Sequence, residues 1–155
     1  MAIHIGLEHK KSEKLAAMLN ELLGDYQILY MNARGYHWNI KGKQFFELHA
    51  KFEEIYTALQ DQIDEIAERI LTLGFTPAHS YTQYLSSPVQ EHRNVTSGEE
   101  CIEGLLQGFK LIIQRQREIM EYASGADDEG SASLMSDYIR DQEKLVWMLR
   151  AYLGK

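Results

Sequence analysis

The sequence predicts an all-α fold, a bundle of four long helices with one long crossover between the second and third helices. Apolar residues recur at intervals of three and four along four long stretches, which is the period of an amphipathic helix. The chain has only 2 prolines and 11 glycines in 155 residues, so few positions break a helix. Both prolines lie in a polar segment that separates the second and third stretches. We expect residues 1–155 to form a single domain with a short N-terminal tail at 1–11.

The first two helices are expected to form a pair joined by a short loop. The first extends from Ser12, a suitable N-cap, to about Trp38, and it ends by Gly42. The second covers residues 44–73 and stops at Gly74.

The second half of the chain begins with the crossover, residues 75–96, which can contain a short helix. A connection of this length is unusual in a compact domain and is expected to pack against another element or subunit. Ser97 with Glu100 matches a capping box and opens a third helix that extends to about Ala123. The last helix covers about 131–153.

The second helix carries a set of possible metal ligands on one face. At 100° per residue, His49, Glu53, Asp64 and Glu68 fall within an arc of about 100°. At 1.5 Å rise per residue, His49 and Glu68 lie roughly 28 Å apart, so one chain cannot place all four on one ion. However, His49 with Glu68 and Glu53 with Asp64 have the same midpoint, near Ala58. A two-fold axis there would set His49 and Glu53 opposite Asp64 and Glu68 of the partner subunit.

Such a dimer would contain two identical sites, about 22 Å apart. His37, on the preceding helix, is placed to complete each site. Mixed imidazole and carboxylate ligands suit iron, zinc or manganese better than calcium or magnesium. The alternative is that these residues form the solvated polar face of an amphipathic helix. The chain has no Glu-x-x-His, the motif of an intrachain di-metal centre in four-helix bundles, which favours the interface site.

Three segments carry a specific pattern of histidines, acids and aromatics: YHWNIKGKQFFELHAKFEEIY, DEIAERILTLG and RDQEKLVWMLRAYLG. In these, and over nearly the whole chain, the sequence resembles the Dps mini-ferritins, the DNA-protection-during-starvation proteins. The resemblance implies a ferritin-like bundle that assembles as a hollow dodecamer. It further implies iron storage and protection from oxidative stress, in which ferrous iron is oxidised, preferentially by hydrogen peroxide, and the ferric mineral is kept inside.

The resemblance also implies which residues act. The catalytic, metal-binding ferroxidase ligands fall on His37, His49 and Glu53 from one subunit and on Asp64 and Glu68 from its two-fold mate. One departure is Glu53, where the family commonly has aspartate. Zinc is expected to be able to substitute for iron in this ligand set.

Two further expectations concern residues outside the ligand set. Trp38 follows the first histidine, as in the family, where an aromatic near the site can intercept radicals; the alternative is a packed interface residue. Asp127, Asp128 and Glu129 form an acidic loop that, repeated about a three-fold axis, would concentrate iron on its way into the cage. The alternative for this loop is a solvated turn.

Composition restricts the other function classes. The chain starts without an apolar run long enough for a signal peptide and has no stretch that could span a membrane, so we expect a cytoplasmic protein that can associate with the nucleoid. A single cysteine, Cys101, cannot form an internal disulfide and is expected to be buried. The net charge of −7 opposes attraction to nucleic acid.

DNA binding is expected to be weak or absent at neutral pH. The N-terminal segment holds Lys10, Lys11 and Lys14 against Glu8 and Glu13, which is only a small positive excess. Two alternatives stay open: a nucleoid-associated DNA-protecting protein, and a structural cage with weak ferroxidase activity.

Overall fold

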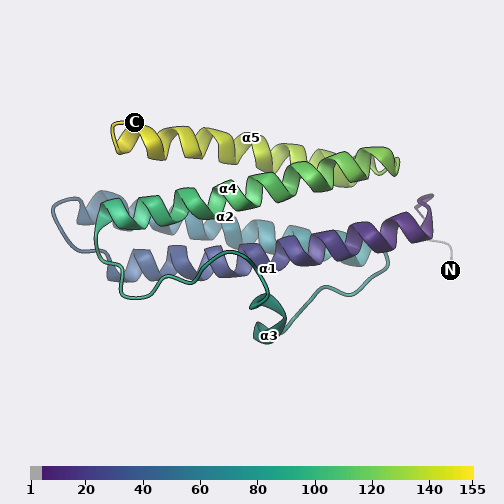
Figure 1. Cartoon of the computed structure of the whole chain (residues 1–155), viewed down its shortest axis with the longest axis horizontal. Helices are drawn as coiled ribbons and strands as arrows, with labels where there is room; N and C mark the ends of the chain where they lie inside the picture. Colours follow the sequence, from purple (N-terminus) through teal and green to yellow (C-terminus); the bar gives the residue numbers. More distant parts are fainter. Residues whose placement is uncertain (1–4) are drawn as a thin grey trace.

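The computed structural model describes residues 5–155, and this part of the chain folds into helices without a strand. The helices follow in the order α1 (His9–Asn39), α2 (Phe45–Thr72), α3 (Tyr81–Tyr84), α4 (Gly98–Gly125) and α5 (Glu129–Tyr152). Figure 1 shows the four long helices side by side, with α3 and the crossover along the outer side of α1. The prediction of an all-α four-helix bundle with a short helix in its crossover is confirmed. The predicted tail at 1–11 falls partly on residues 1–4, which lie outside the described residues.

The start of α1 differs from the prediction. The helix begins at His9 with Glu8 as N-cap, and the predicted N-cap, Ser12, is wrong. The backbone N–H of Ser12 donates to the Glu8 carbonyl at 3.0 Å, and the Ser12 side chain is buried. A helix can begin without a side-chain cap where the free N–H groups of its first turn reach water. Lys10 and Lys11 therefore lie on the helix rather than in a tail.

The other helix ends follow local sequence signals. Ser97 is the N-cap of α4, and its hydroxyl accepts a hydrogen bond from the Glu100 backbone N–H at 3.5 Å, as the capping motif predicts. Gly74 follows α2 with φ +94°, a left-handed conformation that favours glycine. In α5 the N-cap is Asp128, so this helix begins slightly before the predicted start at about Ser131.

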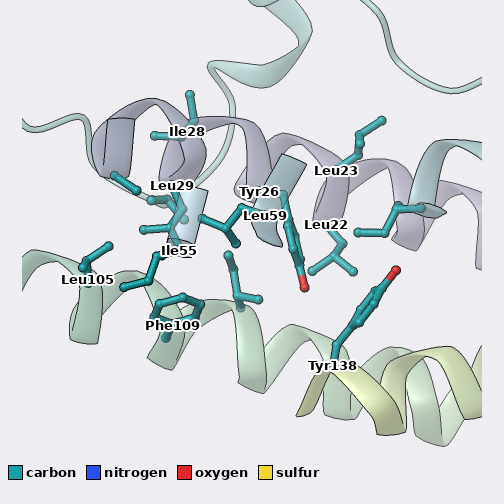
Figure 2. Packing of buried hydrophobic residues seen from close by; sticks show 14 of the residues in the cluster. Leu22, Leu23, Tyr26, Ile28, Leu29, Ile55, Leu59, Leu105, Phe109 and Tyr138 are labelled. Carbon is teal, nitrogen blue, oxygen red and sulfur yellow. The ribbon is translucent and has the colours of Figure 1, made fainter. Parts of the chain in front are cut away.

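The core lies between the four long helices, which each contribute buried apolar side chains. Figure 2 shows Leu22 and Tyr26 of α1, Leu59 of α2, Phe109 of α4 and Tyr138 of α5 within this core. The rings of Tyr26 and Tyr138 approach each other from opposite sides, with centroids 6.1 Å apart. Their burial raises the pKa of both phenols well above the ordinary range.

A closed ring of hydrogen bonds lies in the middle of this core. The Tyr26 hydroxyl donates to Gln116 Oε1 at 2.6 Å, Gln116 Nε2 donates to Gln142 Oε1 at 2.7 Å, and Gln142 Nε2 donates to the Tyr26 oxygen at 2.7 Å. Gln62 of α2 accepts a longer bond from Gln142, at 3.4 Å. Neutral side chains thus occupy the bundle centre, where an intrachain di-metal protein would place carboxylates.

Two asparagines of α1 hold the crossover. Asn20 accepts a hydrogen bond from the backbone N–H of Ala78 at 2.7 Å. Asn32 donates to the Gln90 carbonyl at 2.8 Å and accepts from the His92 backbone N–H at 3.0 Å. The crossover therefore packs against α1, which confirms the expectation that so long a connection lies on another element. None of the helices described is both long and apolar enough to cross a membrane.

Candidate metal centre

His37, near the end of α1, and His49, near the start of α2, lie in direct contact. Their rings are stacked, with centroids 3.8 Å apart and planes 12° from parallel. Nδ1 of His37 lies 2.6 Å from the backbone carbonyl of His49, and Nδ1 of His49 lies 2.7 Å from the carbonyl of His37. A carbonyl oxygen only accepts hydrogen bonds, so each Nδ1 carries the proton. The lone pair of each neutral ring is then on Nε2, the arrangement typical of metal-binding histidines.

Neighbouring aromatic rings fix this pair. Phe45 stacks on His49, with ring centroids 4.8 Å apart. Tyr56, two turns after His49 on α2, meets the His37 ring edge-on at 5.4 Å and 71°. The short loop between α1 and α2, in which Gly42 has a φ of +126°, brings these residues together. His37 is 8% exposed, so its ring is almost enclosed by these contacts.

The acidic candidates lie along the exposed side of the same helix. Glu53, Asp64 and Glu68 are all exposed, and α2 is unbroken over Phe45–Thr72. A hydrogen bond with Asp64, together with the charge of Asp64, raises the pKa of Glu68. Asp64 and Glu68 are thus neighbouring carboxyl groups, and a pair of this kind is a candidate for binding a cation.

The chain holds two half-sites rather than one complete site. His37 and His49 are together, and Asp64 and Glu68 are together, but along the helix axis His49 and Asp64 lie about 22 Å apart. Within the residues described, no three His, Cys, Asp or Glu side chains are grouped so that they could hold a metal ion. The ligand spacing leads us to expect that one subunit holds the two pairs apart. That a partner subunit completes each site stays a prediction.

The three acids of the predicted iron route have different surroundings. Asp128 is 2% exposed, and its Oδ1 accepts from the Ser131 N–H at 2.9 Å and from Arg69 at 2.6 Å. Its Oδ2 accepts from the Ser131 hydroxyl at 2.7 Å. Asp128 therefore caps α5 and pairs with α2, whereas Asp127 and Glu129 are exposed to solvent.

Trp38 lies beside the site with 61% of its surface exposed. The Arg34 guanidinium stacks over its indole at 4.9 Å and over the ring of Tyr30 at 5.0 Å. The Tyr30 ring in turn meets Tyr56 edge-on, with centroids 5.9 Å apart. Aromatic contacts thus extend from His37 through Tyr56 of α2 to Tyr30 of α1.

Sequence reasoning missed Tyr56 and Phe45 as neighbours of the histidines. The spacing of Tyr56 from His49, two full turns, was an available signal, because such residues share a helix face. The paired carbonyl bonds of the histidines have no counterpart in the sequence, since they depend on how closely two helix ends approach.

Comparisons with known proteins agree with the fold. Residues 16–155 match the model of the ferritin-like domain. The crystal structure of the DPS protein from Vibrio cholerae O1, described as a member of a broad superfamily of ferritin-like diiron-carboxylate proteins, is similar with a TM-score of 0.96 and 57% identity, covering 99% of this chain and 98% of that one. The DNA protection during starvation protein of Porphyromonas gingivalis is 39% identical over 97% of this chain and 95% of its own length. An uncharacterized protein of Haemophilus influenzae is 59% identical over 95% of this chain and 92% of its own length.

Proposed function

This chain belongs to the Dps family of ferritin-like proteins, and on that premise we propose that it oxidises ferrous iron with hydrogen peroxide and stores the ferric product in a dodecameric cage. The observation that carries the proposal is the division of the ligands into two half-sites. One is the stacked pair of His37 and His49, and the other is the neighbouring carboxyl pair of Asp64 and Glu68.

The complete site forms when two antiparallel copies of α2 meet about a two-fold axis near Ala58. Nε2 of His37, Nε2 of His49 and the Glu53 carboxylate then come from one subunit. Asp64 and Glu68 of the partner subunit supply the opposite side. Glu53 is one methylene longer than the aspartate common in the family and keeps the carboxylate as a ligand.

The ligand set fits the proposed chemistry. Imidazole and carboxylate ligands bind ferrous iron, and the carboxylate charges favour the ferric ion that forms when an electron leaves. Hydrogen peroxide takes up two electrons and two protons to give water. Two ferrous ions at one interface supply both electrons together, so no hydroxyl radical is released. Zinc would occupy the same ligands without redox chemistry and would inhibit the reaction.

Iron uptake is assigned to the exposed members of the acidic loop. Asp127 and Glu129 present carboxylates to solvent, and copies of this loop around a three-fold axis would attract ferrous ions. The third acid, Asp128, has its carboxylate engaged by Arg69 and Ser131.

DNA binding is the second candidate, because the Porphyromonas gingivalis relative is named a DNA protection during starvation protein. For this chain we propose that such binding is weak or absent at neutral pH. The net charge is −7, Lys10 and Lys11 lie on α1, and the Lys14 ammonium stacks over the Tyr122 ring at 4.7 Å. Retention of the cage on duplex DNA at low salt would favour the DNA-protecting alternative.

Anaerobic loading with ferrous iron followed by peroxide tests the proposed function. The wild type should consume peroxide and retain many irons in a cage-sized peak on size exclusion. A variant with His49→Ala and Glu68→Ala should lose the rapid oxidation. A matched variant with His79→Ala and Glu91→Ala, outside the site, should behave as wild type. Equal and small iron retention by all three proteins would contradict the proposal and favour a structural cage.

A further inference from the structure

Arg34, one turn before His37 on α1, carries a guanidinium without an anionic partner. Its Cζ lies over the rings of both Tyr30 and Trp38, 5.0 and 4.9 Å from their centroids. Nη1 donates to the Tyr30 hydroxyl at 3.2 Å, Nη2 contacts only the Met31 sulfur at 3.6 Å, and Nε is buried without a partner among the described residues. A thioether is a weak acceptor, so this cation is fixed in place with much of its hydrogen-bonding capacity unused.

The other paired arginines show how this fold ordinarily uses the side chain. Arg69, Arg115, Arg117 and Arg140 each bind a carboxylate of the same chain. Arg34 makes no such ion pair within the described residues. A planar guanidinium that is already held by stacking is suited to bind a carboxylate, because little freedom is lost when the ion pair forms. Such a side chain can therefore take a carboxylate from another subunit.

The register of α1 against α2 fixes the level at which Arg34 lies. His37 meets His49, and earlier residues of α1 meet later residues of α2, so the two helices are antiparallel. Arg34, three residues before His37, is therefore level with Phe52, three residues after His49. Asp64 of the same chain is about 18 Å further along the axis, beyond the reach of the guanidinium.

The two-fold axis near Ala58 brings the second copy of Asp64 to this level. The axis that relates Glu53 to Asp64 of the partner subunit sets Phe52 about 1.5 Å along the helix from that Asp64. Glu53 of the same chain is also near this level, but within the described residues no ion pair joins it to Arg34. We infer that Arg34 binds the carboxylate of Asp64 of the partner subunit through Nη2, an inference that rests on the two-fold site of the proposed function.

This ion pair makes Arg34 a positioning residue for the shared site. Asp64 and Glu68 are neighbouring carboxyl groups whose negative charges repel, and the neutral rings of His37 and His49 do not offset those charges. The guanidinium offsets them and holds one oxygen of Asp64, which directs the other oxygen toward the histidines before a metal arrives. Pairing of two subunits and alignment of the ligand set are then one event.

Subunit pairing without metal tests this contact. Arg34→Glu sets like charges against each other at both contacts of a homodimer, and so does Asp64→Arg. A dimer with one subunit of each variant has two attractive contacts instead. With a chelator present, native mass spectrometry should show each variant dissociating at least about 10-fold more readily than wild type, whereas co-expression should give stable heterodimers. Arg140→Glu should pair as wild type, because Arg140 is 71% exposed and its partner Asp137 is on the same helix.

Neutral variants test the same contact with milder changes. Arg34→Gln and Asp64→Asn should each raise the dissociation constant of the metal-free dimer about 10-fold. The combined variant should be about as weak as either one, because both substitutions remove the same contact. Arg34→Gln should also lower the zinc affinity of the assembly several-fold, while circular dichroism shows unchanged helix content.

The opposite results separate the ion pair from the proposed function. Charge variants that form heterodimers no better than homodimers, or neutral substitutions whose effects multiply, overturn the ion pair and leave the ferroxidase standing. Equal zinc affinity of Arg34→Gln and wild type overturns the positioning role. Wild type that consumes no peroxide with iron overturns the proposed function and the positioning role with it.

Discussion

His37 and His49 each donate a ring N–H to the backbone carbonyl of the other, over 2.6 and 2.7 Å. Each imidazole is therefore both a candidate ligand and the device that orients its neighbour. The two bonds also join the end of α1 to the start of α2, so the loop geometry and the ligand geometry depend on each other.

Replacing one histidine should therefore affect the other. His49→Ala removes one ligand and the N–H that bonds the His37 carbonyl, and it removes the stacking partner of the His37 ring. We expect zinc affinity to fall by about 10-fold or more, since removal of outer contacts alone has effects of this size. Calorimetric titration measures it, with His79→Ala as the control. Unchanged affinity in His49→Ala would exclude this histidine as a ligand.

The raised pKa of Glu68 beside Asp64 predicts a pH effect on the metal-free protein. Because the folded-state pKa of Glu68 is raised, the folded chain binds this proton more tightly than the unfolded chain, so stability is lost as the pH rises through the folded pKa. Glu68→Gln should be slightly more stable than wild type at neutral pH and equal to it in acid. The effect is small because solvent screens an exposed pair. Thermal unfolding at both pH values measures it, and a pH-independent difference would contradict the assignment.

The three acids of the loop should have different roles: Asp128 stabilises the fold, whereas Asp127 and Glu129 attract iron. Asp128→Ala removes the cap of α5 and the partner of Arg69, and we expect a loss of about 2–4 kcal/mol in the free energy of unfolding. Asp127→Asn with Glu129→Gln should leave stability unchanged and slow iron uptake. Asparagine suits position 127 because its φ is +58°. Urea unfolding measures the stability of both variants, and stopped-flow iron uptake measures their rates. Slow uptake in a stable Asp128→Ala, with lost stability in the double variant, would contradict these roles.

The hydrogen-bonded ring in the core predicts a cost for a small substitution. Tyr26→Phe removes a hydroxyl that both donates to Gln116 and accepts from Gln142. Gln116 Oε1 is left buried without this donor, and Gln142 Nε2 keeps only its longer bond to Gln62. We expect destabilisation by about 1–3 kcal/mol in urea unfolding. Tyr81→Phe, at a residue 81% exposed, is the matched control and should have no measurable effect. Equal stability of Tyr26→Phe and wild type would mean that the ring contributes little.

The helices and the spacing of the ligands could be predicted from sequence because both depend on helical periodicity. Ser97 was predicted to begin the third helix and Gly74 to end the second, and both predictions were confirmed because each residue acts on its own helix end. Ser12 was misassigned because a polar residue in the first turn resembles a cap even where the helix has already begun. Cys101 is buried as expected, and burial raises the pKa of its thiol to about 12.

The features that the sequence could not predict all depend on contacts between distant elements. In the sequence Asp128 is one of three neighbouring acids. Only its ion pair with Arg69, a residue distant in the chain, shows that it stabilises the fold. The carbonyl bonds of His37 and His49 likewise require the two helix ends to be in place. The pairing of half-sites depends on a second subunit, so the ligand set as a whole stays a prediction.

Subunit mixing tests the shared site most directly. His49→Ala and Glu68→Ala each break both sites of a symmetric dimer, but a mixed dimer restores one site, from the histidines of one variant and Glu68 of the other. Co-expression in equal amounts pairs unlike subunits in half of the dimers, so about a quarter of wild-type zinc sites and of rapid iron oxidation should return. Each variant alone should show neither. No recovery on mixing, with assembly intact, would contradict a site shared between two subunits.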